Sequence, residues 1–352
     1  MKHLAAISIL AAALVLGASA SAQTQPPAPK AEAAKTKSKP PPAAKKPTTP
    51  AADSKQAPPT PTATTPPAPD DPNVDLVYGA YQRGQYKTAF DLASARAQAG
   101  DPKAMTMLGE LYANELGVKR DEVKANYWYK RAADAGDREA MFALAMMRIG
   151  GRGGPADRQE AVKLLASAAK LGEPKAAYNL ALLYLDGQTL PQDLKRAAEL
   201  LRMASDAGNS EAQYALATFY KEGTGVEKDL EKSVRLLQAA SLADNVDAEV
   251  EYAIALYNGT GTAKNQAAAV ALLRKAAKQG SPIAQNRLAR VLASGQGAPM
   301  DQVEAMKWHL VAKTAGRGDP DLDQLFAHLS PDDRAKAEAA AQRWLGKPLL
   351  GN

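Results

Sequence analysis

Apolar side chains recur along most of this chain with the spacing of one helix face. Ala176, Leu180, Leu183 and Tyr184 are three to four residues apart or adjacent, which places them on one side of an α-helix. The same pattern returns 36 residues later at Ala212, Leu216, Phe219 and Tyr220. The pattern predicts amphipathic helices that turn these positions toward a core.

Three further columns of residues repeat with the same period of 36. Glycine holds six of the seven positions in the first column, which consists of Gly100, Gly136, Gly172, Gly208, Asp244, Gly280 and Gly316. The second column consists of Gly117, Gly153, Thr189, Gly225, Gly261 and Gly297. The third consists of Asp121, Asp157, Asp193, Asp229, Asn265 and Asp301. Three columns in phase over six units indicate an internal repeat.

Each column marks a helix boundary. A glycine of the first column suits the left-handed residue that ends a helix, and it precedes a start signal such as Asp101-Pro102 or Ser281-Pro282. This signal opens the first helix of the unit, called helix A. The Asp or Asn of the third column can cap the second helix, called helix B. Every unit is therefore predicted to be a helical hairpin.

Small residues at the contact positions predict that the hairpins pack closely. The slot after the core leucine of helix A is filled by Gly109, Ala145, Ala181, Ala217 and Ala289. Because one hairpin cannot bury its own apolar face, neighbours must stack. The predicted fold class is all-α, an α-solenoid superhelix of antiparallel helical hairpins with a 36-residue repeat.

The combined motif resembles a known repeat. The motif consists, in order, of Ala-x-x-x-Leu-Ala-x-x-Tyr, Gly-x-Gly-Val, Asp and Lys-Ala-x-x-Trp-Tyr-x-x-Ala-Ala-x-x-Gly. This order is similar to the Sel-one-like repeat, a longer relative of the tetratricopeptide repeat. Tyr127 to Gly136 and Ala212 to Val226 match best, and the resemblance covers Asp101 to Gly316. It implies an α-solenoid that serves as a protein–protein adaptor. Exported bacterial members resemble envelope regulators and host-contact factors.

The two ends and one unit depart from the motif. Residues 73–100 are predicted to form an N-terminal capping hairpin, residues 101–316 the six repeats, and residues 317–352 C-terminal capping helices. Ser330 is the expected N-cap of a last helix that buries Trp344 or Leu345. In the fifth unit Asp244 replaces glycine and residues 250–252 are displaced by one position, so we expect a local distortion there.

The first 72 residues have a different composition from the repeats. Residues 1–22 combine Lys2, an apolar run from Leu4 to Leu16 and small residues that end in Ala22, which is typical of a cleaved signal peptide. Residues 23–72 hold 15 of the 24 prolines and no aromatic residue. They are predicted to be a Pro/Ala/Lys-rich disordered linker. The expected location is the periplasm or the exterior of the cell.

Charge and cysteine content restrict the chemistry. The excess of 44 Lys+Arg over 38 Asp+Glu lies entirely before Asp70, so the repeats are neutral overall and a nucleic-acid groove is not expected. The absence of cysteine excludes disulfides, thiolate nucleophiles and Cys-ligated metals. After signal removal His309 and His328 remain, and neither has a metal-ligand spacing. We expect no enzyme activity, no metal and no cofactor.

The remaining helix A positions, expected on the concave side, form the candidate surface for a protein partner. They comprise an apolar middle and a basic end: Phe142, Met146, Tyr178, Asn179, Leu182, Tyr214, Thr218, Asn286, Arg287 and Arg290. Large apolar residues on an exposed face are typical anchors of protein interfaces. An alternative interpretation is that the aromatic rings lie flat against the next repeat as secondary core.

Two functions remain open from the sequence. The first is a non-enzymatic scaffold in the bacterial cell envelope, which regulates a signalling receptor or envelope machinery by binding a protein. The second is binding or remodelling of the peptidoglycan cell wall, for which the Lys-rich linker and the pair Arg287 and Arg290 are the basis.

We predict that the exported protein is cleaved between Ala22 and Gln23 or between Ala20 and Ser21, because Ala-x-Ala pairs end at both places. N-terminal sequencing of the protein from cells measures the cleavage site. A mature chain that still begins at Met1 would contradict the signal-peptide interpretation.

Overall fold

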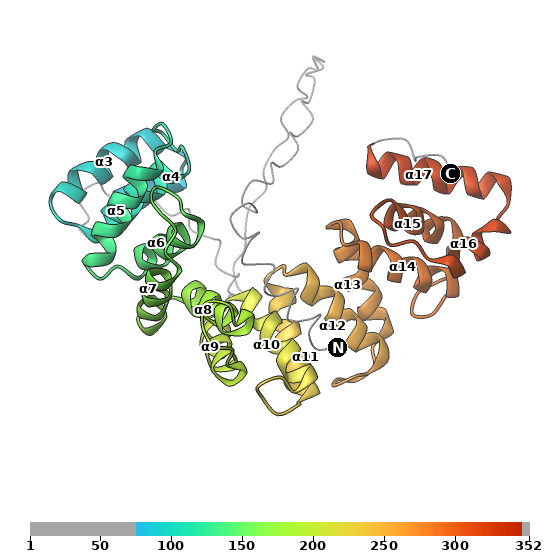
Figure 1. Ribbon diagram of the computed structural model, residues 1–352. Helices are drawn as coiled ribbons and strands as arrows, with labels where there is room; N and C mark the ends of the chain where they lie inside the picture. The colour runs from blue at the N-terminus through green and yellow to red at the C-terminus, as the bar shows by residue number, and fades with distance from the viewer. Residues whose placement is uncertain (1–74, 347–352) are drawn as a thin grey trace, which may run out of the picture.

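The computed structural model is a row of helices that bends into an open arc, from the blue helices at one end to the red helices at the other (Figure 1). The structure describes residues 75–346, so the predicted signal peptide and linker lie outside the described residues. Within residues 75–346 there are sixteen α-helices and no strand. The predicted all-α solenoid is confirmed.

The helices alternate between the two positions of the hairpin. The helices A are α4 (Pro102–Ala113), α6 (Arg138–Gly150), α8 (Pro174–Asp186), α10 (Ser210–Glu222), α12 (Val246–Asn258) and α14 (Pro282–Ser294). The helices B are α5 (Glu122–Asp134), α7 (Arg158–Lys170), α9 (Leu194–Asp206), α11 (Leu230–Leu242), α13 (Gln266–Lys278) and α15 (Gln302–Thr314). The flanking helices are α2 (Leu76–Gln82), α3 (Tyr86–Gln98), α16 (Pro320–Ala327) and α17 (Pro331–Leu345). From α2 to α16, each helix packs against the next one along the chain.

Each helix B begins at a capping side chain, as the third column predicts. Asp193, at a φ of −141°, accepts a hydrogen bond of 2.9 Å from the backbone N–H of Arg196. The same cap recurs at Asp121, Asp157, Asp229, Asn265 and Asp301. Such a cap stabilises a helix by about 1 kcal/mol, because it satisfies an amide that has no partner within the helix.

The left-handed residues of the first column join one hairpin to the next. Its six glycines have φ values from 76° to 93°. Asp244 adopts the same region at a φ of 58°, and α12, which follows, keeps 13 residues and a regular cap at Asn245. The expected distortion of the fifth unit is therefore wrong. Aspartate reaches the left-handed region more readily than most residues, so the period survives without glycine.

The glycines of the second column bring their A–B turns onto the preceding hairpin. Gly225, at a φ of 66°, lies so close to the first residue of α9 that a Cβ would collide with the carbonyl group of Leu194. Gly153 and Gly261 stand in the same relation to Glu122 and Leu230. These turns therefore require glycine for two reasons, their backbone conformation and the contact with the neighbour; the third unit has Thr189 in this column, which is not at positive φ.

Small residues form the seam between the helices, as predicted. Ala181 and Ala217 are 0% and 1% exposed. At Gly109 a Cβ would lie 2.6 Å from the ring of Tyr129, which fills that space instead. The predicted core positions Leu180, Leu183, Leu216 and Phe219 are buried, and Tyr184 and Tyr220 are half-buried at the edge of the core.

The C-terminal cap differs in one respect from the expectation. Ser330 caps α17 by accepting a hydrogen bond from the backbone N–H of Asp333, as predicted. Leu345 packs partly against the core, but Trp344 is 41% exposed and rests its ring edge-on against Trp308. The helix contacts α15 through alanines that leave little room for a large ring beneath it, and Ala337 and Ala341 are the residues fully buried.

We predict that Gly225→Ala destabilises the array more than Gly208→Ala. Both substitutions put a side chain at positive φ, which costs about 1–2 kcal/mol, but only Gly225 faces the carbonyl of Leu194, whereas Gly208 faces open space. The collision should add about 1–3 kcal/mol. Urea unfolding of both variants measures the difference, and equal losses would show that the turn does not rest on the preceding helix.

Candidate partner-binding surface

The helices A of the N-terminal units line the inner side of the arc. In Figure 1, α6 and α8 lie toward the inside of the arc relative to α7 and α9. One hollow of about 880 Å³ is lined jointly by residues of α2, α4, α6 and the start of α8. A surface must be concave to surround one hollow with the flanking helix α2 and three successive helices A, so side chains that leave these helices away from the core point into the groove.

The predicted apolar middle of the surface is only partly accessible. Phe142, Tyr178 and Tyr214 occupy one column, one unit apart, and each side chain is half-buried. Phe142 and Tyr178 pack against the large core cluster of α6 to α10, and Tyr214 packs against the cluster that contains Leu237. Each ring therefore covers the core with one part and faces the groove with another. Met146, on the same face, is also half-buried.

Leu182 does not belong to the exposed surface. It is 1% exposed and shares a buried cluster with Leu183 and Leu185. The rings of Phe142 and Tyr178 pack against this cluster and exclude water from it. The expectation that Leu182 is an accessible anchor is therefore wrong, because α8 turns a wider apolar face to its neighbours than its repeat pattern indicates.

The two tyrosines lie among carboxylates. Burial and the nearby Glu211 raise the pKa of Tyr178 to about 12. Burial, Asp247 and Glu251 raise the pKa of Tyr214 to about 12. Both phenols are neutral at physiological pH, so each hydroxyl can donate a hydrogen bond. The surface around them is partly apolar and carries the carboxylates named above.

The two polar residues of the predicted middle bond to their own helices. Asn179 Nδ2 donates to the carbonyl oxygen of Lys175 at 2.8 Å. Thr218 Oγ1 donates to the carbonyl oxygen of Tyr214 at 3.2 Å. Both side chains remain half-buried at the edge of the aromatic column.

The predicted basic end is largely neutralised. Arg290 Nε lies 2.5 Å from Asp319 Oδ2, and a second guanidinium nitrogen lies 3.4 Å from Asp321. Asn286 also donates to Asp319, at 3.1 Å. Burial opposes ionisation of Asp319, yet the hydrogen bonds from Asn286 and Arg290 hold its pKa below the usual value. Arg287 is exposed and forms no ion pair within residues 75–346.

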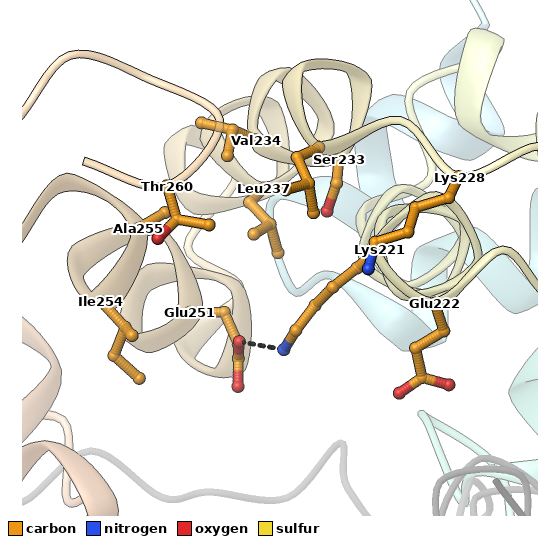
Figure 2. Close-up of a pocket in the computed structure, with 11 residues that line it drawn as sticks. Lys221, Glu222, Lys228, Ser233, Val234, Leu237, Glu251, Ile254, Ala255 and Thr260 are labelled. Atoms are coloured by element: carbon orange, nitrogen blue, oxygen red, sulfur yellow. Dashed lines mark hydrogen bonds and ion pairs between the residues drawn. The ribbon is translucent and has the colours of Figure 1, made fainter. Parts of the chain in front are cut away.

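Two further hollows lie farther toward the C-terminus. The C-terminal hollow, of about 570 Å³, lies between α12, α14 and α16, where Ile254, Tyr257 and Leu325 are among its walls and Arg287 and Arg290 also line it. The central hollow, of about 500 Å³, lies between α10, α11 and α12 (Figure 2). The repeat pattern predicts neither hollow. The signal for the central hollow was Ala255, which takes the core slot of Leu183 and Phe219.

The histidines have structural positions. His309 is 1% exposed, its Nε2 lies 2.8 Å from Asp323 Oδ1, and its ring contacts Phe326. This contact ties α15 to α16. His328 is exposed at the end of α16.

Within residues 75–346, no cluster of three or more His, Cys, Asp and Glu residues is placed to hold a metal ion. None of the described helices has the length and apolar character needed to cross a membrane.

We predict that Tyr178 ionises near pH 12, although an unperturbed tyrosine ionises near pH 10. Because the folded state holds the phenolic proton more tightly, the stability contributed by the neutral phenol is complete below pH 10 and is lost as the pH rises through 12. The difference in absorbance at 295 nm between the parent and Tyr178→Phe measures this titration. A midpoint near pH 10 would show that the ring is fully solvated.

Comparison with known proteins identifies the repeat. The family model described as the Sel1 repeat matches residues 102–137, 138–173, 174–209, 210–245, 246–281 and 282–316. The chain is similar to a Sel1 repeat protein from Oxalobacter formigenes, with 26% identity, a TM-score of 0.59 and coverage of 67% of this chain and 94% of that one. It is also similar to c5321, a protective antigen present in uropathogenic Escherichia coli strains that displays an SLR fold, with 26% identity, a TM-score of 0.53 and coverage of 77% and 68%. The search of curated proteins found no match. Because the repeat model matches more than half of the residues, the chain belongs to the Sel1 repeat family.

Proposed function

We propose that this protein is a non-enzymatic scaffold of the bacterial cell envelope that binds a protein partner along the inner face of its helices A. Sel1 repeat proteins are generally protein-interaction scaffolds. The observation that carries the proposal is the column of Phe142, Tyr178 and Tyr214, which places a half-accessible ring at one position in three successive units.

These rings have the properties of interface anchors. Aromatic side chains supply large contact areas, and interfaces are enriched in tyrosine. Because Phe142, Tyr178 and Tyr214 already pack against core clusters, little side-chain freedom remains to be lost on binding. The Tyr178 and Tyr214 hydroxyls can donate hydrogen bonds to a partner backbone. An extended segment that runs along the groove would meet one ring in each unit.

The proposed location rests on residues 1–22, whose pattern is that of a signal peptide. In the periplasm, the partner would be part of a signalling receptor or of envelope machinery. Binding of cell-wall material has less support, because one of its two bases, beside the Lys-rich linker, was a basic end. Arg290 is engaged by Asp319 and Asp321, which leaves Arg287 as the arginine of the two that forms no ion pair within residues 75–346.

Cross-linking of the protein in its native envelope, followed by mass spectrometry, identifies the partner. We then predict that replacing Tyr178 and Tyr214 together by Ala weakens capture of that partner by about 2 kcal/mol or more, near thirtyfold, as for interface hot spots. Binding of the purified partner to immobilised parent and variant measures the loss.

The matched control is Tyr127→Ala, which removes a tyrosine that is 53% exposed on α5, a helix B. It should leave capture unchanged. Circular dichroism and thermal melting must show that the double variant remains folded. If the folded double variant captures the partner as well as the parent does, the aromatic column is not the binding surface.

A further inference from the structure

One core column of the repeat contains a single small residue. Its members are Leu111, Met147, Leu183, Phe219, Ala255 and Val291. The five large residues are all at most 6% exposed, and Ala255 is 8% exposed. The fifth unit therefore carries one methyl group at a position where every other unit inserts a large apolar side chain.

The neighbouring side chains do not fill the missing volume. Val234 and Leu237 of α11 face Ala255 of α12 across the central hollow of about 500 Å³ (Figure 2). Ser233, also at the hollow, replaces the alanine found at the equivalent position of the units before and after it. Protein cores are normally packed without such space, so the fifth unit offers an apolar recess that is open to the surface.

The mouth of the recess carries balanced charge. Lys221 Nζ of α10 lies 2.8 Å from Glu251 Oε2 of α12, and this ion pair links the two helices beside the recess (Figure 2). Lys228 and Glu222 add one charge of each sign. The charges cancel and the interior is apolar, so the group that fits inside is an uncharged hydrocarbon or aromatic side chain.

The recess adjoins a second feature on the next helix A. Ile254 lines both the central and the C-terminal hollow, so the two are neighbours. Arg287 of α14 lines the C-terminal hollow and has no ion-pair partner within residues 75–346. Because Ile254 and Arg287 line the same hollow, an extended segment that fills the central hollow can reach Arg287 within a few residues.

We propose that the central hollow is a socket for one large apolar side chain of an extended protein segment, and that an acidic residue a few positions away binds Arg287. The apolar side chain of the segment fills the volume that a larger residue would occupy at position 255. The carboxylate of the segment is the ion-pair partner that Arg287 does not have within residues 75–346. The proposal rests on the proposed function in that the segment belongs to a protein partner, and it specifies the chemistry of that segment.

The test uses the full chain with labelled methyl groups and a defined synthetic peptide, acetyl-Gly-Glu-Ala-Ala-Phe-Ala-Ala-Glu-Gly-amide. Its acids flank the Phe on both sides, so either chain direction fits. We expect the peptide to shift the methyl resonances of Val234, Leu237 and Ile254 in NMR titrations. A peptide with Ala in place of Phe should bind at least tenfold more weakly. Absence of shifts in these three residues at the solubility limit of the Phe peptide would overturn the proposal.

Two substitutions in the protein complete the test. Ala255→Leu should fill the socket and weaken the Phe peptide at least tenfold without lowering the melting temperature. Ala271→Leu makes the same change at an exposed position of α13 and should have no effect. Equal affinity of the parent and a folded Ala255→Leu variant would overturn the socket.

The charge assignment has its own readout, which does not depend on Ala255→Leu folding. A peptide with Lys in place of both Glu residues should bind the parent more weakly than the Glu peptide, and Arg287→Glu should reverse this preference. An unchanged preference would overturn the role of Arg287. Because these titrations need no natural partner, their failure is distinct from failure of the tyrosine experiment, which tests the proposed function itself.

Discussion

Close approach of neighbouring backbones is the constraint on which this solenoid depends. Each hairpin has an apolar face that only its neighbours can cover, and the neighbours reach it because the contact residues are small. Gly109 admits the ring of Tyr129, and Ala181 and Ala217 lie fully buried in the seam. Gly225 brings its turn against Leu194 of the preceding unit. A larger group at any of these positions would hold two hairpins apart and expose the core between them.

The small residues at the seams repeat with a strict period, whereas side chains at other positions differ from unit to unit. These differences determine the shape of the surface. Because the backbones are held at a constant spacing, a smaller side chain in the core does not let the helices move together. Ala255 therefore leaves the central hollow open, where Phe219 fills the equivalent place one unit earlier. In the opposite sense, the large rings of Phe142 and Tyr178 extend from the core into the groove. The groove has a different shape in each unit although the backbone repeats.

Charged side chains also vary between equivalent positions of the repeated backbone. Gln213 and Gln285 each donate a hydrogen bond to a carbonyl oxygen eight residues earlier. Glu249 occupies the equivalent slot, is 0% exposed, and as a carboxylate cannot donate; instead Lys275 Nζ lies 2.5 Å from it. The hydrogen bonds of Lys275 to Asp244 and Glu249 raise the pKa of that lysine. Pairing of this kind decides which cations remain available to a partner, and it leaves Arg287 rather than Arg290.

The sequence by itself determined the hairpins, their boundaries and the residues of the seam. A cap such as Asp193 and a left-handed glycine act within a few residues of the chain, and the period of 36 repeats these local requirements six times. Tertiary structure alone decided the burial of Leu182, the neutralisation of Arg290 and the recess at Ala255. Arg290 and Asp319 are 29 positions apart, and Lys221 and Glu251 are 30 apart. Contacts at such separations depend on how the units stack, because side chains from different repeats share the space between them. The aligned repeat sequences do not specify the distances between those side chains.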